Sequence, residues 1–223
     1  MPKEWESELS KQFGLPPFLL ECAHVEGYTA PIPGCLIMMK DYLVKNGGLD
    51  VQGIFRLAPD KKASNDAKQS IDEGRFSGVD DVNCISNLLK VWFRDLPRAL
   101  LQSAKTEEVL NCRTEEQVVS IIDSIEDPYN SILLWLLDLC ADVAEQKDVN
   151  LMSSRNMAIV MTPNLYKAPE LDATMSNATQ VMQLCKKYTE FFEQAVDWRS
   201  NNRDSSMSLK TCMELERVKS CPI

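Results

Sequence analysis

Histidine is nearly absent from this sequence, since His24 is the single histidine in 223 residues. Nucleophile–base pairs and most zinc sites use histidine, so neither triad chemistry nor zinc binding is expected. The Gly-x-Ser-x-Gly and His-Glu-x-x-His motifs and a glycine-rich phosphate loop are also missing. We therefore expect His24 to be a non-catalytic loop residue and the chain to bind no metal.

Paired cysteines are missing as well. The eight cysteines are scattered along the chain without a single Cys-x-x-Cys spacing, and no apolar leader opens the sequence. Free thiols in a reducing compartment are therefore expected. The sequence closes on SCPI, which places Cys221 one position too late for a prenylation box.

Basic charge is in deficit, with 24 Lys and Arg against 33 Asp and Glu, a net charge of −9. This balance argues against a general binder of nucleic acid or of anionic membranes, because both need a basic surface. No apolar run approaches the roughly 20 residues of a membrane span. We expect a cytoplasmic protein that reaches membranes through partners or through flanking regions missing from this chain.

What the sequence does contain is helical periodicity, without a sustained strand alternation or an internal repeat. A capping box at Thr114–Gln117 is expected to begin one helix. Gly47-Gly48, Pro97 and the pair Thr162-Pro163 are expected to end three others. Helical patterns cover residues 34–46, 60–73, 81–96, 114–125, 132–143, 153–161 and 172–197. In the last of these, the residues expected to face inward are Ala178, Val181, Met182, Cys185 and Phe192.

These patterns predict an all-α fold with a single domain of about eight or nine helices. The body is expected over residues 13–197. Residues 1–12 are charged and polar and are expected to form an N-terminal extension. Residues 198–223 begin with the polar stretch RSNNRDSSMS and are expected to form a polar tail, partly helical.

The segment 81–96 has polar residues that allow two interpretations. Lys90 and Arg94 lie about 40° apart on a helical wheel, on the side away from the apolar residues. They form either a solvated polar face or a cationic pair directed at an anionic partner. Like charges four residues apart slightly destabilise a helix, which favours the second interpretation. The apolar arc of this helix contains Val82, Ile85, Leu88, Leu89, Trp92, Phe93 and Leu96.

Two further stretches are ambiguous when each is taken alone. GIFRLAP, residues 53–59, places Arg56 directly after an apolar pair and before a proline. Arg56 is either an ordinary surface residue or a residue held outward on a fixed loop. NMAIVMTPNLY, residues 156–166, places Asn164 after an expected turn. That amide either binds outward or caps local backbone.

In combination, the stretches GIFRLAP, NLLKVWFRDLP and NMAIVMTPNL resemble the RhoGAP domain family, in this order and at these separations. The resemblance covers about residues 13–197. The stretch DVNCISNLLKVWFRDLPRALL is also similar to the plant Rop-directed branch, although the Rho-binding peptide that usually precedes the domain there is absent. RhoGAP domains are all-helical and activate GTP hydrolysis by Rho-family small GTPases.

The resemblance assigns a role to individual residues. Arg56 matches the arginine finger, which is inserted into the nucleotide site of the GTPase. Lys90 and Arg94 match a basic pair in which the lysine contacts the GTPase and the arginine braces the finger loop. Asn164 matches an asparagine that contacts the GTPase switch region, and Asn156 matches a recurrent asparagine that we expect to be structural.

The apolar pair Ile54 and Phe55 is expected to anchor the finger loop inward, so that Arg56 stands outward. Lys61 and Lys62 are then expected to join Lys90 and Arg94 in a local positive face. Three positions depart from the family pattern. Many members have a small hydroxyl residue and a glycine where this chain has Ala58-Pro59, and Thr162 stands where Gly or Ala is commoner.

The resemblance implies a GTPase-activating protein for Rho- and Rac-family GTPases in their GTP-bound state. Such a protein completes the active site of its partner and is not itself an enzyme. It is expected to act as a monomer without a cofactor, because GTP and Mg²⁺ belong to the partner. The alternative is a module of the same fold that binds a GTPase or another protein without accelerating hydrolysis.

Overall fold

The computed structural model describes residues 11–167 and 178–202, and within them the chain folds into nine α-helices, three short 3₁₀ helices and one two-residue β pair. The predicted all-α fold is confirmed. The elements are, in order, η1 (Pro17–Leu19), β1 (Cys22–Ala23), β2 (Ile32–Pro33), α2 (Gly34–Lys45), η2 (Gly48–Asp50), α3 (Lys61–Asp72), α4 (Asn83–Asp95), η3 (Leu100–Ser103), α5 (Thr106–Asn111), α6 (Glu115–Asp123), α7 (Tyr129–Glu145), α8 (Lys147–Asn150), α9 (Ser154–Leu165) and α10 (Ala178–Asn201).

Local signals in the sequence set several of the helix ends. Gly47 adopts a left-handed backbone with φ of 68° after α2, which a residue without a side chain does at little cost. Asp60 caps α3, since its carboxylate accepts a hydrogen bond from the Ala63 N–H at 2.8 Å. Thr114 and Gln117 form both bonds of a capping box before α6, as predicted.

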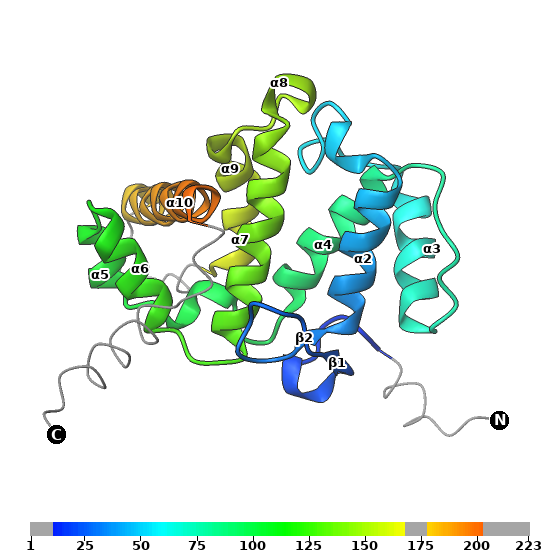
Figure 1. Cartoon of the computed structure of the whole chain (residues 1–223), viewed down its shortest axis with the longest axis horizontal. Helices are drawn as coiled ribbons and strands as arrows, with labels where there is room; N and C mark the ends of the chain where they lie inside the picture. Colours follow the sequence, from blue (N-terminus) through cyan, green and yellow to red (C-terminus); the bar gives the residue numbers. More distant parts are fainter. Residues whose placement is uncertain (1–10, 168–177, 203–223) are drawn as a thin grey trace, which may run out of the picture.

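Helix α7 runs through the middle of the molecule (Figure 1). Helices α2, α3 and α4 lie on one side of it, and α5, α6 and α10 lie on the other. Helix α9 packs against α4, α7 and α10, and so joins the two sides. None of the described helices is long and apolar enough to cross a membrane.

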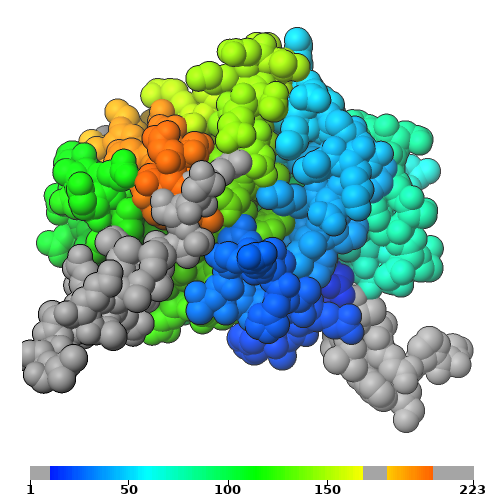
Figure 2. All heavy atoms as spheres, in the orientation of Figure 1, coloured from blue at the N-terminus to red at the C-terminus, as the bar shows by residue number. Residues whose placement is uncertain are grey.

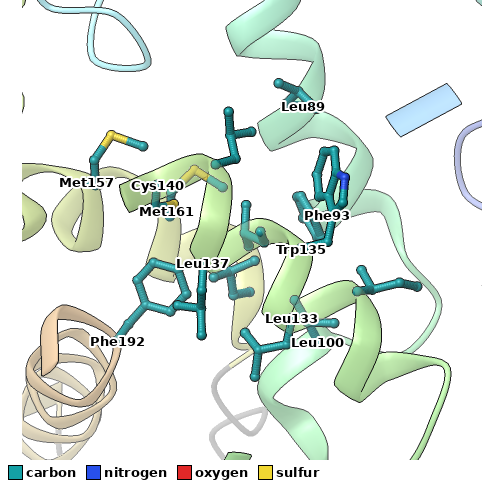
Figure 3. Close-up of a cluster of buried hydrophobic side chains, with 14 of the residues drawn as sticks. Leu89, Phe93, Leu100, Leu133, Trp135, Leu137, Cys140, Met157, Met161 and Phe192 are labelled. Atoms are coloured by element: carbon teal, nitrogen blue, oxygen red, sulfur yellow. The ribbon is translucent and has the colours of Figure 1, made fainter. Parts of the chain in front are cut away.

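The core gathers where these helices meet (Figure 3). Burying each large apolar side chain contributes about 1.5–3 kcal/mol, so a contiguous core of this kind dominates the stability of the fold. The labelled buried side chains come from α4 (Leu89 and Phe93), η3 (Leu100), α7 (Leu133, Trp135, Leu137 and Cys140), α9 (Met157 and Met161) and α10 (Phe192).

Helix α9 corrects one prediction, because it does not stop before Thr162-Pro163 but continues to Leu165 with Pro163 inside it. A proline in the last turn removes one intrahelical hydrogen bond. Leu165 is fully buried and Tyr166 nearly so, and the Tyr166 ring stacks on Tyr188 of α10 with centroids 3.8 Å apart. This burial outweighs the lost bond. The helix ends where the Tyr166 N–H donates to the Thr162 carbonyl at 3.1 Å.

Helix α10 extends beyond the predicted limit at residue 197, to Asn201. The reason is Arg199, whose guanidinium donates to both carboxylate oxygens of Asp138 in α7 at 2.7 and 2.9 Å. The Tyr28 hydroxyl donates to the same carboxylate at 2.6 Å, and burial followed by this hydrogen bond raises the pKa of Tyr28. Residues 198–201 of the expected tail are therefore helical; residues 203–223, like residues 1–10 and 168–177, lie outside the described part, so the rest of the tail stays a prediction.

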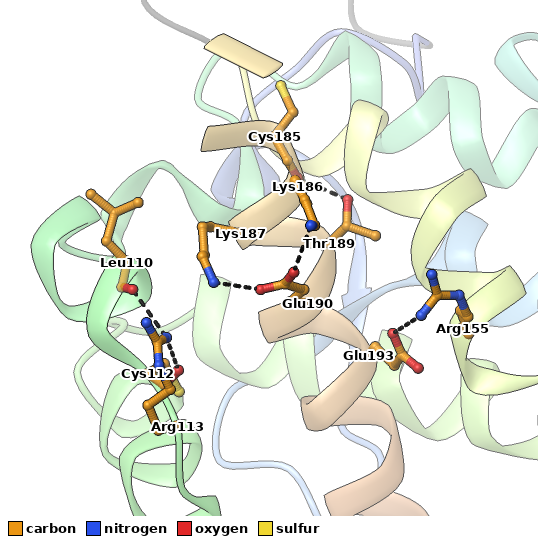
Figure 4. A network of polar contacts seen from close by, with 10 residues as sticks. All are labelled: Leu110, Cys112, Arg113, Arg155, Cys185, Lys186, Lys187, Thr189, Glu190 and Glu193. Atoms are coloured by element: carbon orange, nitrogen blue, oxygen red, sulfur yellow. Dashed lines mark hydrogen bonds and ion pairs between the residues drawn. The ribbon is translucent and has the colours of Figure 1, made fainter. Parts of the chain in front are cut away.

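The inward face of α10 also differs from the prediction. Phe192 is buried as expected, whereas Met182 and Cys185 are exposed. The residues of α10 that do enter the core are Tyr188, Phe191, Phe192, Ala195 and Val196. Apart from the Arg199–Asp138 pair, the ion pairs of this helix include half-buried contacts such as Lys187 with Glu190 at 2.7 Å (Figure 4), and solvent-accessible pairs of this kind contribute little to stability.

Candidate functional site

The loop of residues 53–59, called the finger loop below, lies between η2 and α3 and has a tightly turned backbone. Gly53 has φ of 72° and Phe55 has φ of 65°. The carbonyl oxygen of Gly53 accepts hydrogen bonds from the N–H groups of Arg56 and Leu57, both at 2.9 Å. The loop therefore folds back over Gly53 and carries its own hydrogen bonds.

Glycine at position 53 is needed for two reasons. Its left-handed backbone favours a residue without a β-carbon. A β-carbon there would also lie 3.1 Å from Cγ of Leu57 and 3.4 Å from a guanidinium nitrogen of Arg56. The head of Arg56 thus rests over its own loop in the free chain, although the residue as a whole is exposed.

Ile54 and Phe55 are both fully buried, while Arg56 directly after them is exposed. This is the pattern expected of an anchored loop. A left-handed backbone at a non-glycine residue costs about 1–2 kcal/mol. Burial of the Phe55 ring contributes about 1.5–3 kcal/mol, enough to hold the residue in that conformation.

Lys90 of α4 holds the finger loop from the outside. Its ammonium donates a hydrogen bond to the carbonyl oxygen of Phe55. Burial, and then the nearby charge of Arg94, lower the pKa of Lys90. Arg94 itself is exposed, and its Nε lies 3.7 Å from a carboxylate oxygen of Asp95. Among the described residues, the hydrogen bond that this basic pair makes to the finger loop thus comes from the lysine, and the bracing role expected of Arg94 stays a prediction.

The reason lies in the position of each residue along α4. Both side chains leave the same side of the helix, but Lys90 is one turn nearer to the N-terminus of α4 and its flexible stem reaches the Phe55 carbonyl. Arg94 is left at the surface with the greater part of its side chain accessible to solvent. A contact of Lys90 or Arg94 with a GTPase stays a prediction.

A residue that sequence analysis did not single out holds the finger loop from the inside. Asn150, at the end of α8, is fully buried. Its carbonyl oxygen accepts the hydrogen bond of the Gly53 N–H at 2.8 Å. Figure 2 shows the finger-loop segment, light blue to cyan, next to the yellow-green α8 segment at the top of this face of the molecule. Only a polar residue inside the apolar run VNLM marks Asn150 in the sequence.

Asn164 and Asn156 both lie on α9. Because the helix continues through Pro163, Asn164 is a helical residue, and its amide donates to the carbonyl of Val160 at 2.9 Å. In the part of the chain that the structure describes, the Asn164 side chain makes no hydrogen bond to the finger loop. Asn156 donates to the carbonyl of Leu151 at 2.9 Å, a local contact that fits the structural role expected of it.

Lys61 and Lys62 are exposed in the first turn of α3, immediately after the finger loop. The amino end of a helix carries a partial positive charge, so a cation there costs about 0.3–1 kcal/mol. Together with the exposed Arg56 and Arg94 they are four exposed cations near the loop, although Asp60 caps α3 beside them and Asp95 lies against Arg94.

Among curated proteins, the chain is 34% identical to Rho GTPase-activating protein 2 of Arabidopsis thaliana over 174 residues, which are 78% of this chain and 40% of that protein. It is 35% identical to Rho GTPase-activating protein gacA of Dictyostelium discoideum over 179 residues, 80% of this chain and 51% of that protein. The chain thus spans two fifths to one half of these relatives. Residues 33–170 match the family profile described as the RhoGAP domain.

Solved structures agree with this match at the level of the fold. The structure of human Rho GTPase activating protein 15 superimposes with a TM-score of 0.67 and 18% identity, covering 93% of this chain and 99% of that one. The BH domain of Graf, the GTPase regulator associated with focal adhesion kinase, superimposes with a TM-score of 0.58 over 77% of this chain and 92% of that one.

Proposed function

Because the chain belongs to the RhoGAP domain family, we propose that it accelerates GTP hydrolysis by a small GTPase of the Rho or Rac family. In this proposal Arg56 enters the nucleotide site of the GTP-bound partner in trans, and Lys90, Arg94 and Asn164 contact the partner. GTP and Mg²⁺ belong to the GTPase, and the chain supplies no chemistry without it. The body over residues 13–197, extended to the end of α10 at Asn201, is the unit proposed to do this.

The chemistry explains why an arginine is used. Hydrolysis of GTP develops negative charge on the transferred phosphoryl group and on the leaving oxygen. A guanidinium delivered from outside adds fixed positive charge and several N–H donors where that charge develops, and docking excludes water. Lysine lacks the planar fork of donors and is a poorer substitute. Arginine fingers of other activating proteins contribute roughly 10³–10⁵ in rate.

The single observation that carries the proposal is the fixed backbone beneath an exposed Arg56. Phe55 is buried and its carbonyl is bonded to Lys90, while the Gly53 carbonyl holds the Arg56 N–H. Because the guanidinium rests near Gly53 in the free chain, the proposal requires the Arg56 side chain to rotate outward toward the partner. A fixed attachment point reduces the entropy lost when the arginine is positioned in the partner's site.

The charge around the loop supports the same partner. Lys61 and Lys62 keep their cations at the unfavourable end of α3, on a chain that is acidic overall. A positive surface around Arg56 would attract a nucleotide phosphate and acidic groups on a GTPase. Such attraction raises the association rate and weakens with added salt.

The test is single-turnover hydrolysis by a panel of GTP-loaded Rho and Rac proteins, with and without the chain. We expect wild type to accelerate at least one GTPase by roughly 10³–10⁵. Arg56→Ala should lose most of this acceleration, and Arg56→Lys should recover little of it because the fork of donors is missing. Absence of any acceleration by wild type across the panel would refute the proposal.

The same experiment distinguishes the non-catalytic alternative. A binding module would hold the GTP-loaded partner tightly without changing its hydrolysis rate. Its affinity would then be indifferent to Arg56→Ala. Affinity measured by fluorescence anisotropy beside the hydrolysis rate separates the two functions, since an activating protein loses rate in this variant while it keeps most of its binding.

A further inference from the structure

Asn150 connects four segments of the chain through one fully buried residue. Its amide nitrogen donates to the carbonyl oxygens of Leu49 at 2.7 Å and of Val143 at 2.8 Å. Its amide oxygen accepts from the Met152 N–H at 2.7 Å, and its backbone carbonyl accepts from the Gly53 N–H at 2.8 Å. The end of α7, the turn η2 and the approach to α9 therefore meet at this side chain, and the start of the finger loop is bonded to the backbone of the same residue.

The chemistry of these bonds restricts the residue type. An uncharged amide offers two donors and an acceptor, and both donors and the acceptor are used here. Aspartate has the same shape but presents only acceptors to the carbonyls of Leu49 and Val143. Alanine leaves both carbonyls without this donor in a buried site. Neither substitution preserves the set of bonds.

The bonds lead directly to Arg56. The Asn150 side chain holds Leu49, and its three bonds fix the position of its own backbone carbonyl, which holds Gly53; the residue therefore fixes both ends of the segment that leads into the finger loop. The carbonyl of Gly53 in turn accepts the N–H of Arg56. Arg56 is thus two backbone hydrogen bonds away from Asn150, while Lys90 holds the loop separately at Phe55.

We propose that Asn150 is a positioning residue for Arg56, which sets the geometry of the finger loop from the buried side without touching the partner. This inference rests on the proposed GTPase-activating function. It assigns Asn150 an effect on the maximal rate of hydrolysis, because a displaced finger is still able to dock but no longer reaches the transition state. A displacement of 1 Å lowers a rate by about 100-fold.

The kinetic test compares Asn150→Ala and the isosteric Asn150→Asp with wild type, in single-turnover hydrolysis at increasing concentrations of the chain. We expect the rate at saturation to fall about 100-fold in Asn150→Ala, with a much smaller change in the half-saturating concentration. A change confined to the half-saturating concentration would overturn the proposal, because it would assign Asn150 to binding.

A double variant separates positioning from general destabilisation. If Asn150 acts through Arg56, then Asn150→Ala added to Arg56→Ala should lower the saturating rate no further, since the group it positions is already gone. Losses that multiply would overturn the proposal. Ile122→Ala, a core variant in α6 on the far side of α7, is the control for lost stability and should keep the wild-type saturating rate.

Hydrogen exchange tests the same inference in the wild-type chain. It therefore still gives an answer if the Asn150 variants fail to fold. The amide of Gly53 donates to the backbone carbonyl of Asn150 and the amide of Met152 to its side-chain oxygen, so if the side chain fixes the loop the two amides should open together and exchange with similar protection. Exchange at Gly53 that is far faster than at Met152 would overturn the proposal. If wild type accelerates no GTPase, the proposed function fails, while this measurement still decides whether Asn150 fixes the loop.

Discussion

The contact between Lys90 and Phe55 leads to a prediction that separates two roles for the lysine. The resemblance to RhoGAP domains implies that the lysine contacts the GTPase, whereas its ammonium bonds the finger loop in the free chain. Lys90→Met removes the ammonium and keeps a stem of similar length. If the lysine braces the loop, Lys90→Met should lower both the free energy of unfolding of the free chain and its saturating rate of hydrolysis. A lysine that only contacts the GTPase would leave the free energy of unfolding unchanged.

The structure gives the expected magnitude. A hydrogen bond to a charged group contributes about 1.5–3 kcal/mol, and Lys90 is partly buried, so solvent replaces the bond poorly. The released Phe55 carries a left-handed backbone worth about 1–2 kcal/mol of strain, which favours other loop conformations. If the competent loop is disfavoured by 1.5–3 kcal/mol, the saturating rate falls by roughly 10- to 100-fold.

The assay pairs urea unfolding with single-turnover hydrolysis, and Arg94→Met is the matched control one turn along α4. Arg94 is exposed and lies 3.7 Å from Asp95, so its removal should change the free energy of unfolding by no more than about 0.5 kcal/mol. Lys90→Met should lower that free energy by about 1.5 kcal/mol or more. Equal stability losses in the two variants, or a Lys90→Met protein with wild-type stability, would refute the bracing role.

Four further predictions follow from other contacts. Gly53→Ala should lower the free energy of unfolding by about 1–2 kcal/mol in urea titrations, because φ is 72° there, and Gly53→Ser should be no better tolerated. Asp138→Ala should lower it by about 3–5 kcal/mol, since the largely buried Arg199 loses its partner; a loss under 1 kcal/mol would show that solvent replaces the pair. Thr162→Val should be neutral or stabilising by urea titration, because the buried hydroxyl has no hydrogen-bond partner among the described residues. Burial raises the pKa of Tyr166 to about 12, so the neutral phenol stabilises the folded chain fully below pH 10, and this stabilisation is lost as the pH rises toward 12. In urea titrations over that pH range, the free energy of unfolding of Tyr166→Phe should therefore fall less steeply than that of wild type.

Helix boundaries divide into those that local sequence predicts and those that it does not. Gly47, the Asp60 cap and the Thr114 capping box act on their own neighbours, so the ends they mark were predictable. Pro163 failed as a stop signal because the burial of Leu165 and the stacking of Tyr166 on another helix are distant effects. The same reason explains α10, which Arg199 extends through its contact with α7.

The candidate site likewise has features that local sequence predicts and others that depend on distant contacts. An apolar pair followed by an arginine predicts a buried anchor beneath an exposed side chain, and the burial of Phe55 and exposure of Arg56 agree with that pattern. A helical wheel places Lys90 and Arg94 on one side of α4 but does not reveal which head reaches a given carbonyl. Asn150 was not predictable, because its bond to Leu49 spans 101 positions of the sequence.

The residues that fix the finger loop are far apart in the sequence, so the loop cannot be transplanted by itself. The seven residues GIFRLAP contain the arginine and its apolar anchor, but the groups that fix their backbone are Lys90 on α4 and Asn150 on α8. A peptide of this sequence, or a graft into another scaffold, would keep the residues and lose the conformation. An engineered activator would have to import α4 and the α8 turn along with the loop. The smallest portable unit is therefore a spatial cluster and not a continuous stretch of chain.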